Sequence, residues 1–424
     1  MTDLPIEDFE AHGVRAPGTA WMIAGSLVGA IAAYVFNAVG GRALGTEAFA
    51  PIGALWTTLF VIATVVLVPL EQFATREASR NRWVIRDDMR VWLALIGSAI
   101  VLGVLFVWVA DEQLFAGEPV YAVQMGLMML GYGVLFFGRG VLAGERRFAA
   151  VGLLLGAESM LRLVVGLVVI ALGGGAVALG WSMVVAPVMV LLTPFWRRPA
   201  GQAGTKRTES AGRFLAAYAS GTAASQILLA ASPLAVTFLG GTKATFSVVY
   251  AVFTLFRAPL TLIYSLQGRL LSMLVRLVDQ GERRRVRIFS AQVAAAGLAL
   301  TVLAWFVGRW IGPDIIQLLF GDEFRPSSTL AGAVAAGMVA ASAAQITGQV
   351  LVAEGATGRL ANAWAAGLLV GATLILGLSG PADTTVGVAF MAGEVVALCM
   401  VGFSVLRSHR ADQFTPAAGG GDSA

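Results

Sequence analysis

Two stretches of the chain, LGTEAFAPIGALWTTLF at residues 44–60 and GGTKATFSVVYAVFTLF at residues 240–256, share one pattern. An offset of 196 residues aligns them with six identical positions out of seventeen. The identical positions are Gly45/Gly241, Thr46/Thr242, Ala48/Ala244, Thr58/Thr254, Leu59/Leu255 and Phe60/Phe256. Self-similarity at a fixed offset indicates an architecture built from repeated units. We therefore expect a molecule of two similar lobes.

The composition around this repeat is that of a membrane protein. Of the 424 residues, 58% are hydrophobic and 13% are charged, and the mean hydropathy is +0.80. Soluble proteins contain about 25% charged residues and about 45 to 50% apolar residues. Such a chain has no interior large enough to bury its apolar residues, so we exclude a soluble enzyme with a single membrane anchor.

Apolar runs bounded by Arg, Gly, Pro or acidic residues predict twelve transmembrane helices. The first six are expected at about 20–41, 47–70, 91–110, 120–142, 150–172 and 177–195. The second six are expected at about 213–239, 244–271, 288–310, 327–352, 361–379 and 385–407. Because each repeat has an even number of spans, both lobes insert in the same direction. The predicted fold is all-α and integral to the membrane, with a pseudo-two-fold axis along the membrane normal.

The basic residues predict the orientation of these spans. With the N-terminus inside, 23 of the 29 Lys and Arg residues lie on the inner side and 4 lie on the outer side. Cytoplasmic loops carry the excess of Lys and Arg in membrane proteins. We therefore expect both termini to be cytoplasmic and the net charge of +4 to reflect topology, not nucleic-acid binding.

The predicted organisation has five parts. They are an N-terminal tail at 1–18, an N-lobe at 19–196, a polar linker at 197–212, a C-lobe at 213–408 and a disordered tail at 409–424. The linker is rich in Gly and Arg, which is typical of a flexible tether. All connections between spans are short, so no separate extramembrane domain is expected.

Several function classes are excluded by what the sequence lacks. Cys399 is the only cysteine, and His12 and His409 lie in the tails. No G-x-x-x-x-G-K-[ST] nucleotide-binding string occurs. We therefore expect no metal site, no cofactor, no ATP and no enzymatic activity.

Ionisable residues inside spans are rare and mark candidate functional sites. Glu158 and Arg162 lie four residues apart on one helical face, which predicts an ion pair. Arg257 has no acidic residue within seven positions, so it needs a partner from another helix or an anionic ligand. The partner from another helix would be Glu394 or Glu158. Glu394 is itself the candidate for ion coupling, with a structural salt bridge as the alternative.

Uncharged polar residues and glycines complete the candidate features of the spans. Asn37, Gln226, Gln345 and Gln349 are placed to bind sugar hydroxyls, although interhelical hydrogen bonds are the alternative. Three GxxxG pairs predict close approach between helices. These pairs are Gly25/Gly29, Gly152/Gly156 and Gly367/Gly371.

Three segments carry a family resemblance. FNAVGGRALGTEAFAPIGALW at 36–56 resembles the signature of the first two helices of bacterial polysaccharide-transport proteins. These are the O-antigen flippase type of the multidrug/oligosaccharidyl-lipid/polysaccharide exporter superfamily. GRGVLAGERRF at 138–148 and IIQLLFGDEFRPSS at 315–328 are similar to two further stretches of that family. The resemblance implies a carrier of two six-helix lobes that alternates between inward-open and outward-open states in the bacterial cytoplasmic membrane.

The resemblance implies that the cargo is a polyprenyl-diphosphate-linked oligosaccharide for cell-surface polysaccharide synthesis. Its implied partners are the lipid bilayer and the proteins of glycan polymerisation and export. Among the candidate residues, Arg257 and Arg162 are expected to contact the headgroup. One alternative is a multidrug or metabolite antiporter of the same fold, although helix 20–41 lacks the acidic residue that such exporters often carry there. A second alternative is a scaffold that assembles glycan enzymes without transporting anything.

Overall fold

The computed structural model describes residues 18–79, 89–193 and 224–411, and all regular structure within these ranges is helical. The predicted linker at 197–212 lies outside the described residues, as do residues 1–17 and 412–424 of the two predicted tails. The chain divides into two compact units. Unit 1 comprises Met1–Ala219, Thr242–Ser247 and Leu319–Phe324, and unit 2 comprises Ser220–Gly241, Val248–Leu318 and Arg325–Ala424.

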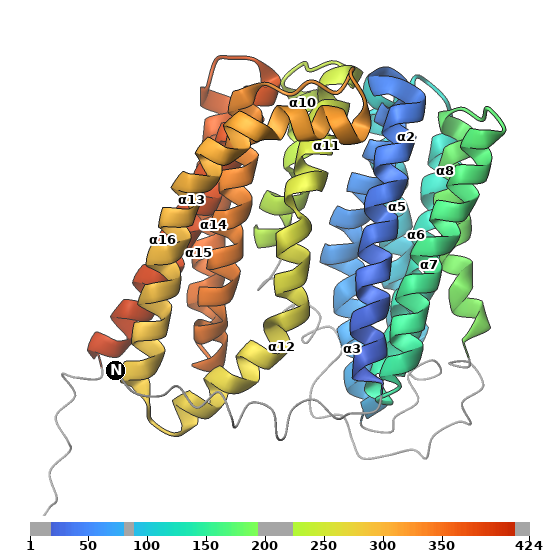
Figure 1. Cartoon of the computed structure of the whole chain (residues 1–424). Coiled ribbons are helices and arrows are strands. Elements are labelled where there is room, and N and C mark those ends of the chain that lie inside the picture. The colour runs from blue at the N-terminus through green and yellow to red at the C-terminus, as the bar shows by residue number, and fades with distance from the viewer. Residues whose placement is uncertain (1–17, 80–88, 194–223, 412–424) are drawn as a thin grey trace, which may run out of the picture. The chain divides into compact units, whose positions relative to one another are not determined.

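Unit 1 is a bundle of helices that run up and down beside one another (Figure 1). Its elements are α2 (Thr19–Ile62), the π-helix η1 (Ala63–Leu67), α3 (Val68–Ser79), α5 (Met89–Val109), η2 (Asp111–Phe115), α6 (Val120–Gly144), α7 (Phe148–Ala171), α8 (Ala176–Val185) and the 3-10 helix η3 (Ala186–Leu192). Pro187 in the first turn of η3 ends the regular α-helix there, so the sixth predicted span is shorter in α-helical form than the expected 177–195.

Helix α2 is interrupted at Gly45, which separates two helical segments. Gly45 has φ 74° and ψ 175°, a conformation essentially restricted to glycine. The backbone N–H of Thr46 donates to Oε2 of Glu323 at 3.0 Å, which supplies an acceptor for one of the free donors that follow the break. The outer loop expected at 42–46 is therefore a single-residue break, and the second segment continues through η1 to Ser79.

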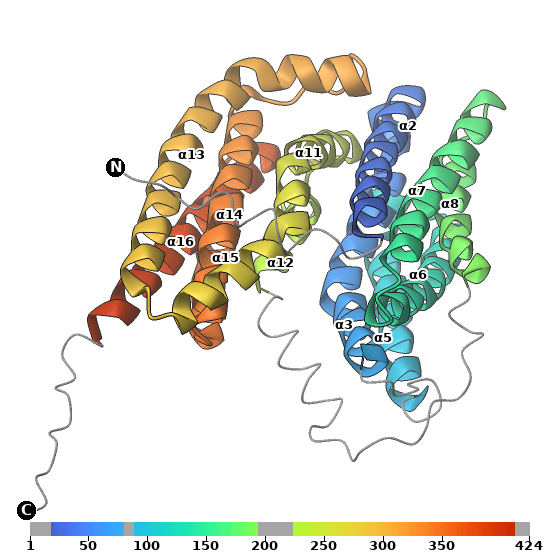
Figure 2. The same ribbon diagram turned by 60° about the horizontal axis from the view of Figure 1, so that its bottom comes forward.

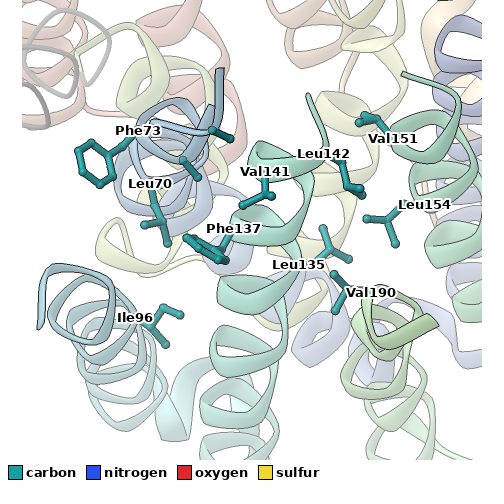
Figure 3. Packing of buried hydrophobic residues seen from close by; sticks show 12 residues of the cluster. Leu70, Phe73, Ile96, Leu135, Phe137, Val141, Leu142, Val151, Leu154 and Val190 are labelled. Atoms are coloured by element: carbon teal, nitrogen blue, oxygen red, sulfur yellow. The ribbon is translucent and has the colours of Figure 1, made fainter. Parts of the chain in front are cut away.

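The apolar core of unit 1 lies between α3, α5, α6, α7 and η3. Figure 3 shows most of its side chains gathered between the helices, with the ring of Phe73 directed to the other side of α3. The residues labelled there are Leu70, Phe73, Ile96, Leu135, Phe137, Val141, Leu142, Val151, Leu154 and Val190. Each is at most 5% exposed, so this cluster is a dry, packed interior. It fixes α6 and α7, the helices that carry the polar residues described below.

The predicted GxxxG pairs mediate close helix packing within each unit. A Cβ atom built on Gly25 of α2 would lie 1.9 Å from the carbonyl oxygen of Gly152 in α7. In unit 2, a Cβ atom on Gly367 would lie 2.5 Å from the carbonyl oxygen of Gly393. Real Cβ atoms cannot approach so closely, so only glycine fits at these crossings. The prediction of close approach is confirmed for both helix pairs.

Unit 2 contains the remaining helices. Its elements are an apolar segment at Ala224–Phe238 that includes η5 (Ser232–Leu234) and α10 (Ala235–Phe238), most of α11 (Lys243–Phe256), α12 (Ala258–Asp279), most of α13 (Arg283–Phe320), α14 (Ser328–Ala353), α15 (Thr357–Gly377) and α16 (Ala382–Ala411). Figure 2 shows α13 changing direction near its C-terminal end. Pro313 lies inside α13, and proline is a usual cause of such a bend.

Among the described residues, eight helices are long and apolar enough to cross a membrane, and three shorter apolar helices accompany them. One of the eight, Ala20–Ser79, contains the break at Gly45 and covers both of the first two predicted spans. Two expectations in unit 2 need correction. The span expected at 244–271 is divided at Arg257, and the loop expected at 311–326 is helical as far as Phe320.

Candidate functional site

Helix α7 places an ion pair in the interior of unit 1. Arg162 Nη1 donates to Glu158 Oε1 at 2.6 Å, across one helical turn. Arg162 is 2% exposed and Glu158 is 7% exposed, so both groups are withdrawn from the surface. The predicted pairing is confirmed. Losing either partner would leave a buried charge uncompensated.

Tyr132 and Ser159 extend this pair into a four-residue network, named here the polar cluster. The Tyr132 hydroxyl donates to Glu158 Oε1 at 2.5 Å and accepts from Arg162 Nη1 at 2.8 Å. Ser159 Oγ donates to Glu158 Oε2 at 3.0 Å and accepts from Arg162 Nη2 at 3.2 Å. Both carboxylate oxygens therefore accept hydrogen bonds, which orients the side chains from α6 and α7.

Aromatic rings from α2 lie against the polar cluster. The Arg162 guanidinium carbon is 4.2 Å from the centroid of the Trp56 ring and 5.8 Å from that of Phe36. A guanidinium within about 6 Å of an aromatic centroid is attracted by the ring quadrupole. These contacts hold Arg162 between α7 and both segments of α2.

A second ion pair joins α3 to α6. Arg139 Nε donates to Glu71 Oε1 at 2.6 Å, and Nη2 donates to Oε2 of the same carboxylate. This forked arrangement is the strongest geometry for an arginine–carboxylate pair. The Arg139 guanidinium carbon also lies 4.3 Å from the centroid of the Phe136 ring.

The polar cluster lines one cavity of about 220 Å³ within unit 1, together with Trp56, Phe136 and Arg139. The lining residues are Ala33, Trp56, Leu59, Phe60, Ala63, Tyr132, Leu135, Phe136, Arg139, Leu154, Leu155, Glu158, Ser159 and Arg162. Ala63 is the first residue of the π-helix η1, and π-helical segments often occur at functional sites. The cavity combines aromatic surfaces with hydrogen-bonding groups whose charges are largely balanced, a composition typical of sites for polar organic ligands.

Asn37 is the other predicted site residue in unit 1. It is 1% exposed, and its Nδ2 donates to the backbone oxygen of Ala33 at 2.8 Å. Asn37 is not among the residues that line the cavity. The structure therefore brings Glu158 and Arg162 together at the cavity and places Asn37 in the helix packing beside it.

The remaining predicted site residues belong to unit 2. Arg257 lies at the joint between α11 and α12, and its Nη2 donates to the backbone oxygen of Leu229 at 2.8 Å. Gln226 is buried in the segment before Pro233, and Gln345 is half-buried in α14. Glu394 is fully buried in α16, and both carboxylate oxygens lie without a hydrogen-bond partner among the described residues. The ion pair expected between Arg257 and Glu394 is therefore not formed here.

Sequence reasoning missed several residues of the unit 1 site, among them Ser159 of the polar cluster. Tyr132 and Trp56 are aromatic residues within predicted spans, where they look like ordinary apolar side chains. Arg139 lies three positions from the expected inner end of its span and counts there as an inner-side charge. Its partner Glu71 lies one position beyond the expected end of another span. The sequence does contain a signal for this pair, because Glu71 and Arg139 carry opposite charges at the same predicted membrane depth.

Comparison with solved structures defines the class of fold. A multidrug resistance MATE family transporter of the MOP superfamily, in its inward-facing conformation, matches 92% of this chain and 96% of its own with a TM-score of 0.69 and 14% identity. An outward-facing structure of such a transporter matches with a TM-score of 0.60 and 13% identity over 94% and 97% of the two chains. A Vibrio cholerae MATE transporter matches with a TM-score of 0.56 and 16% identity over 93% and 97%. The protein therefore has the fold of these multi-pass membrane proteins, as the sequence predicts.

Relatives by sequence are mycobacterial. An uncharacterized protein of Mycobacterium tuberculosis strain ATCC 25618 / H37Rv is 27% identical over 388 residues, which cover 88% of each chain. A second uncharacterized protein of the same strain is 25% identical over 431 residues, covering 94% of this chain and 96% of the relative. No protein-family model matches the chain.

Proposed function

We propose that this protein is a membrane transporter that moves a lipid-linked oligosaccharide from the inner to the outer leaflet by alternating access. The fold of the MATE transporters supports transport, since similar structures occur in inward-facing and outward-facing conformations. The resemblance of residues 36–56, 138–148 and 315–328 to polysaccharide-transport proteins supports a glycan cargo.

The observation that carries the proposal is the chemistry of the unit 1 cavity. Its acidic residue, Glu158, is held by Arg162, so it offers no free carboxylate to a cationic drug. Sugar hydroxyls both donate and accept hydrogen bonds, which suits the hydroxyls of Tyr132 and Ser159. Rings of Trp56, Phe60 and Phe136 offer apolar surface to the faces of a sugar ring.

In this proposal one sugar ring of the headgroup enters this cavity of about 220 Å³, the rest of the headgroup lies outside it, and the polyprenyl tail stays in lipid. Arg162 and Arg139 line the same cavity, and in this proposal each exchanges its carboxylate partner for phosphate oxygens of the headgroup, which guanidinium groups bind in a forked geometry. Arg257 belongs to unit 2, so its contact with the same headgroup stays a prediction from the sequence.

Multidrug transport is the competing function, because the solved structures of similar fold include multidrug resistance transporters. The two functions differ in what accumulates when the gene is lost. A glycan carrier leaves a complete lipid-linked repeat unit at the inner leaflet, whereas loss of a drug exporter leaves the lipid pool unchanged and increases drug sensitivity.

The test is mass spectrometry of lipid-linked glycans in a strain that lacks the gene, with plasmid-borne variants restored at equal membrane levels. We expect accumulation that wild type relieves and Trp56→Ala does not. Trp108→Ala is the matched control, because Trp108 is 75% exposed on α5 and lines no part of this cavity. An unchanged lipid pool in the deletion strain would reject the proposal, and a raised drug sensitivity would favour the antiporter.

A further inference from the structure

A ring contact between α11 and α16 relates the positions of Arg257 and Glu394 in unit 2. The rings of Phe253 in α11 and Phe390 in α16 are in contact, with centroids 4.8 Å apart. Arg257 follows Phe253 by four residues, and Glu394 follows Phe390 by four residues. Residues four apart lie one turn along the same helical face. One turn beyond the ring contact, the chain therefore carries a cation on one helix and an acid on the other.

A further contact places the current partner of Arg257 beside Glu394. Arg257 donates to the backbone oxygen of Leu229, and the preceding residue, Leu228, packs on Gly393. A Cβ atom on Gly393 would lie 3.0 Å from Leu228 Cδ1. The arginine is thus held at a carbonyl in the segment that touches the residue before Glu394.

The carbonyl of Leu229 is available because of a proline. In an α-helix this oxygen would accept the N–H of the residue four positions on, which here is Pro233. Proline has no N–H to give. Instead, Arg257 Nη2 donates to this oxygen at 2.8 Å. Arg257 lies at the joint between α11 and α12, where the helix is already interrupted.

The Leu229 carbonyl has a hydrogen-bond partner, but the carboxyl group of Glu394 does not. This carboxyl group is fully buried, and neither oxygen has a hydrogen-bond partner among the described residues. An isolated charge is costly to bury unless it is paired. The arrangement therefore suits the neutral carboxylic acid, with Arg257 engaged at Leu229 instead.

Few other charges are available to Glu394. The helices packed against α16 are α14, which has no charged residue, α15, whose only charge is Arg359 in its first turn, and α13. In α13, Gly297 lies against Leu398 of α16, and the nearest charges along α13, Arg287 and Arg309, are each more than two turns from Gly297. The segment at 224–238 has none, and α11 carries only Lys243, at its first residue. Within α16, Asp383 and Arg407 lie more than two turns away in opposite directions. Among the described cations of these elements, Arg257 is the one that lies one turn beyond the Phe253–Phe390 contact, as Glu394 does.

We propose that Glu394 is a proton-binding site and that Arg257 moves from the Leu229 carbonyl to the Glu394 carboxylate when the proton leaves. This change of partner by Arg257 loosens the α11–α12 joint and so links proton release to the conformation of unit 2. A lone carboxylate lacks the additional oxygen ligands that a hard metal cation requires, so the bound ion is a proton. The inference rests on the proposed transport function and deepens it by naming the ion that drives it.

Hydrogen-exchange mass spectrometry of the purified full-length protein tests this without any cargo. The measured quantity is the exchange rate of peptides covering the α11–α12 joint and the Leu229 segment across a pH series. Glu394→Gln mimics the protonated acid, so comparison with this variant removes the intrinsic effect of pH on exchange. We expect equal rates at acidic pH and at least about fivefold faster exchange in wild type at alkaline pH.

Variants at four further positions sharpen the test. Pro233→Ala supplies a competing N–H to Leu229 and is expected to give fast exchange at every pH, whereas Pro187→Ala, the matched proline change in unit 1, leaves the pH response intact. Asp383→Asn, whose partner is Ser327, also keeps the response. Arg257→Lys retains the cation and is expected to keep a reduced response even if Arg257→Gln fails to fold.

A wild-type pH response that matches Glu394→Gln throughout would overturn the inference. That outcome leaves the glycan-accumulation test unaffected, so the two proposals fail separately. An unchanged lipid pool in the deletion strain, together with the expected pH response, would reject the glycan cargo while keeping Glu394 as the proton site.

Discussion

At the scale of single residues, the unit 1 site depends on matched charges in a buried setting. Glu158 and Arg162 satisfy each other and also orient Tyr132 and Ser159. Such a network is stable only when every member is present, because the surroundings provide little solvent to replace a lost partner.

The first prediction concerns this pair. Glu158→Ala alone is expected to destabilise the purified protein by about 3 to 5 kcal/mol, because it leaves the Arg162 charge buried and unpaired. The double change Glu158→Ala with Arg162→Met removes both charges and is expected to cost less than Glu158→Ala alone. Denaturation of both variants and of Arg162→Met in one detergent measures the coupling.

Additive effects in this double-mutant cycle would contradict the account, since they would mean that the two side chains contribute independently. Glu112→Ala is the control. Glu112 is an exposed acid in η2, and its removal is expected to change stability by no more than about 0.5 kcal/mol.

At the scale of helices, small residues decide where two segments cross. Gly25 and Gly152 allow the backbones of α2 and α7 to touch, and this packing brings Phe36, on the same segment of α2, to Arg162. The glycines matter here for their lack of a side chain, not for flexibility.

The second prediction follows from that crossing. Gly25→Ala is expected to destabilise unit 1 by about 1 to 3 kcal/mol, because its Cβ meets the Gly152 carbonyl. Gly97→Ala is the matched control, since a Cβ there meets nothing within 4 Å and alanine favours helix. Thermal unfolding of both variants compares them, and equal melting temperatures would contradict the packing described here.

Much of this helical architecture is predictable from the sequence, because apolar length alone specifies a membrane span. The interruptions are harder to predict. Gly45 reverses the chain within one residue, whereas the break at Arg257 has a local signal in Pro259, which lies in the first turn of α12 and has no N–H to continue the preceding helix. The Glu158–Arg162 pair follows from helical spacing, whereas Arg139 and Glu71 meet only through packing of α3 on α6.

At the scale of the whole molecule, the charge distribution predicts the direction of insertion. The basic segments predict that Glu282 lies on the cytoplasmic side and Glu118 on the outer side.

The third prediction tests that orientation. In a Cys399→Ser background, Glu118→Cys is expected to react with a membrane-impermeant maleimide added to intact cells, whereas Glu282→Cys reacts only after the cells are opened. Cys399 must be replaced first because it is free and exposed. Labelling of Glu282→Cys in intact cells would reverse the topology and with it the direction of transport.

The central claim is that the protein itself moves a lipid-linked glycan across a bilayer. The most direct measurement reconstitutes purified protein in phospholipid vesicles with the lipid-linked glycan extracted from the deletion strain. A membrane-impermeant glycan oxidant then reports the rate at which headgroups from the inner leaflet reach the outer surface. We expect wild type and Trp108→Ala to accelerate that rate at least about tenfold over empty vesicles and Trp56→Ala to lose the acceleration, a difference of about 1.4 kcal/mol in the barrier. A wild-type rate equal to that of empty vesicles would contradict the account.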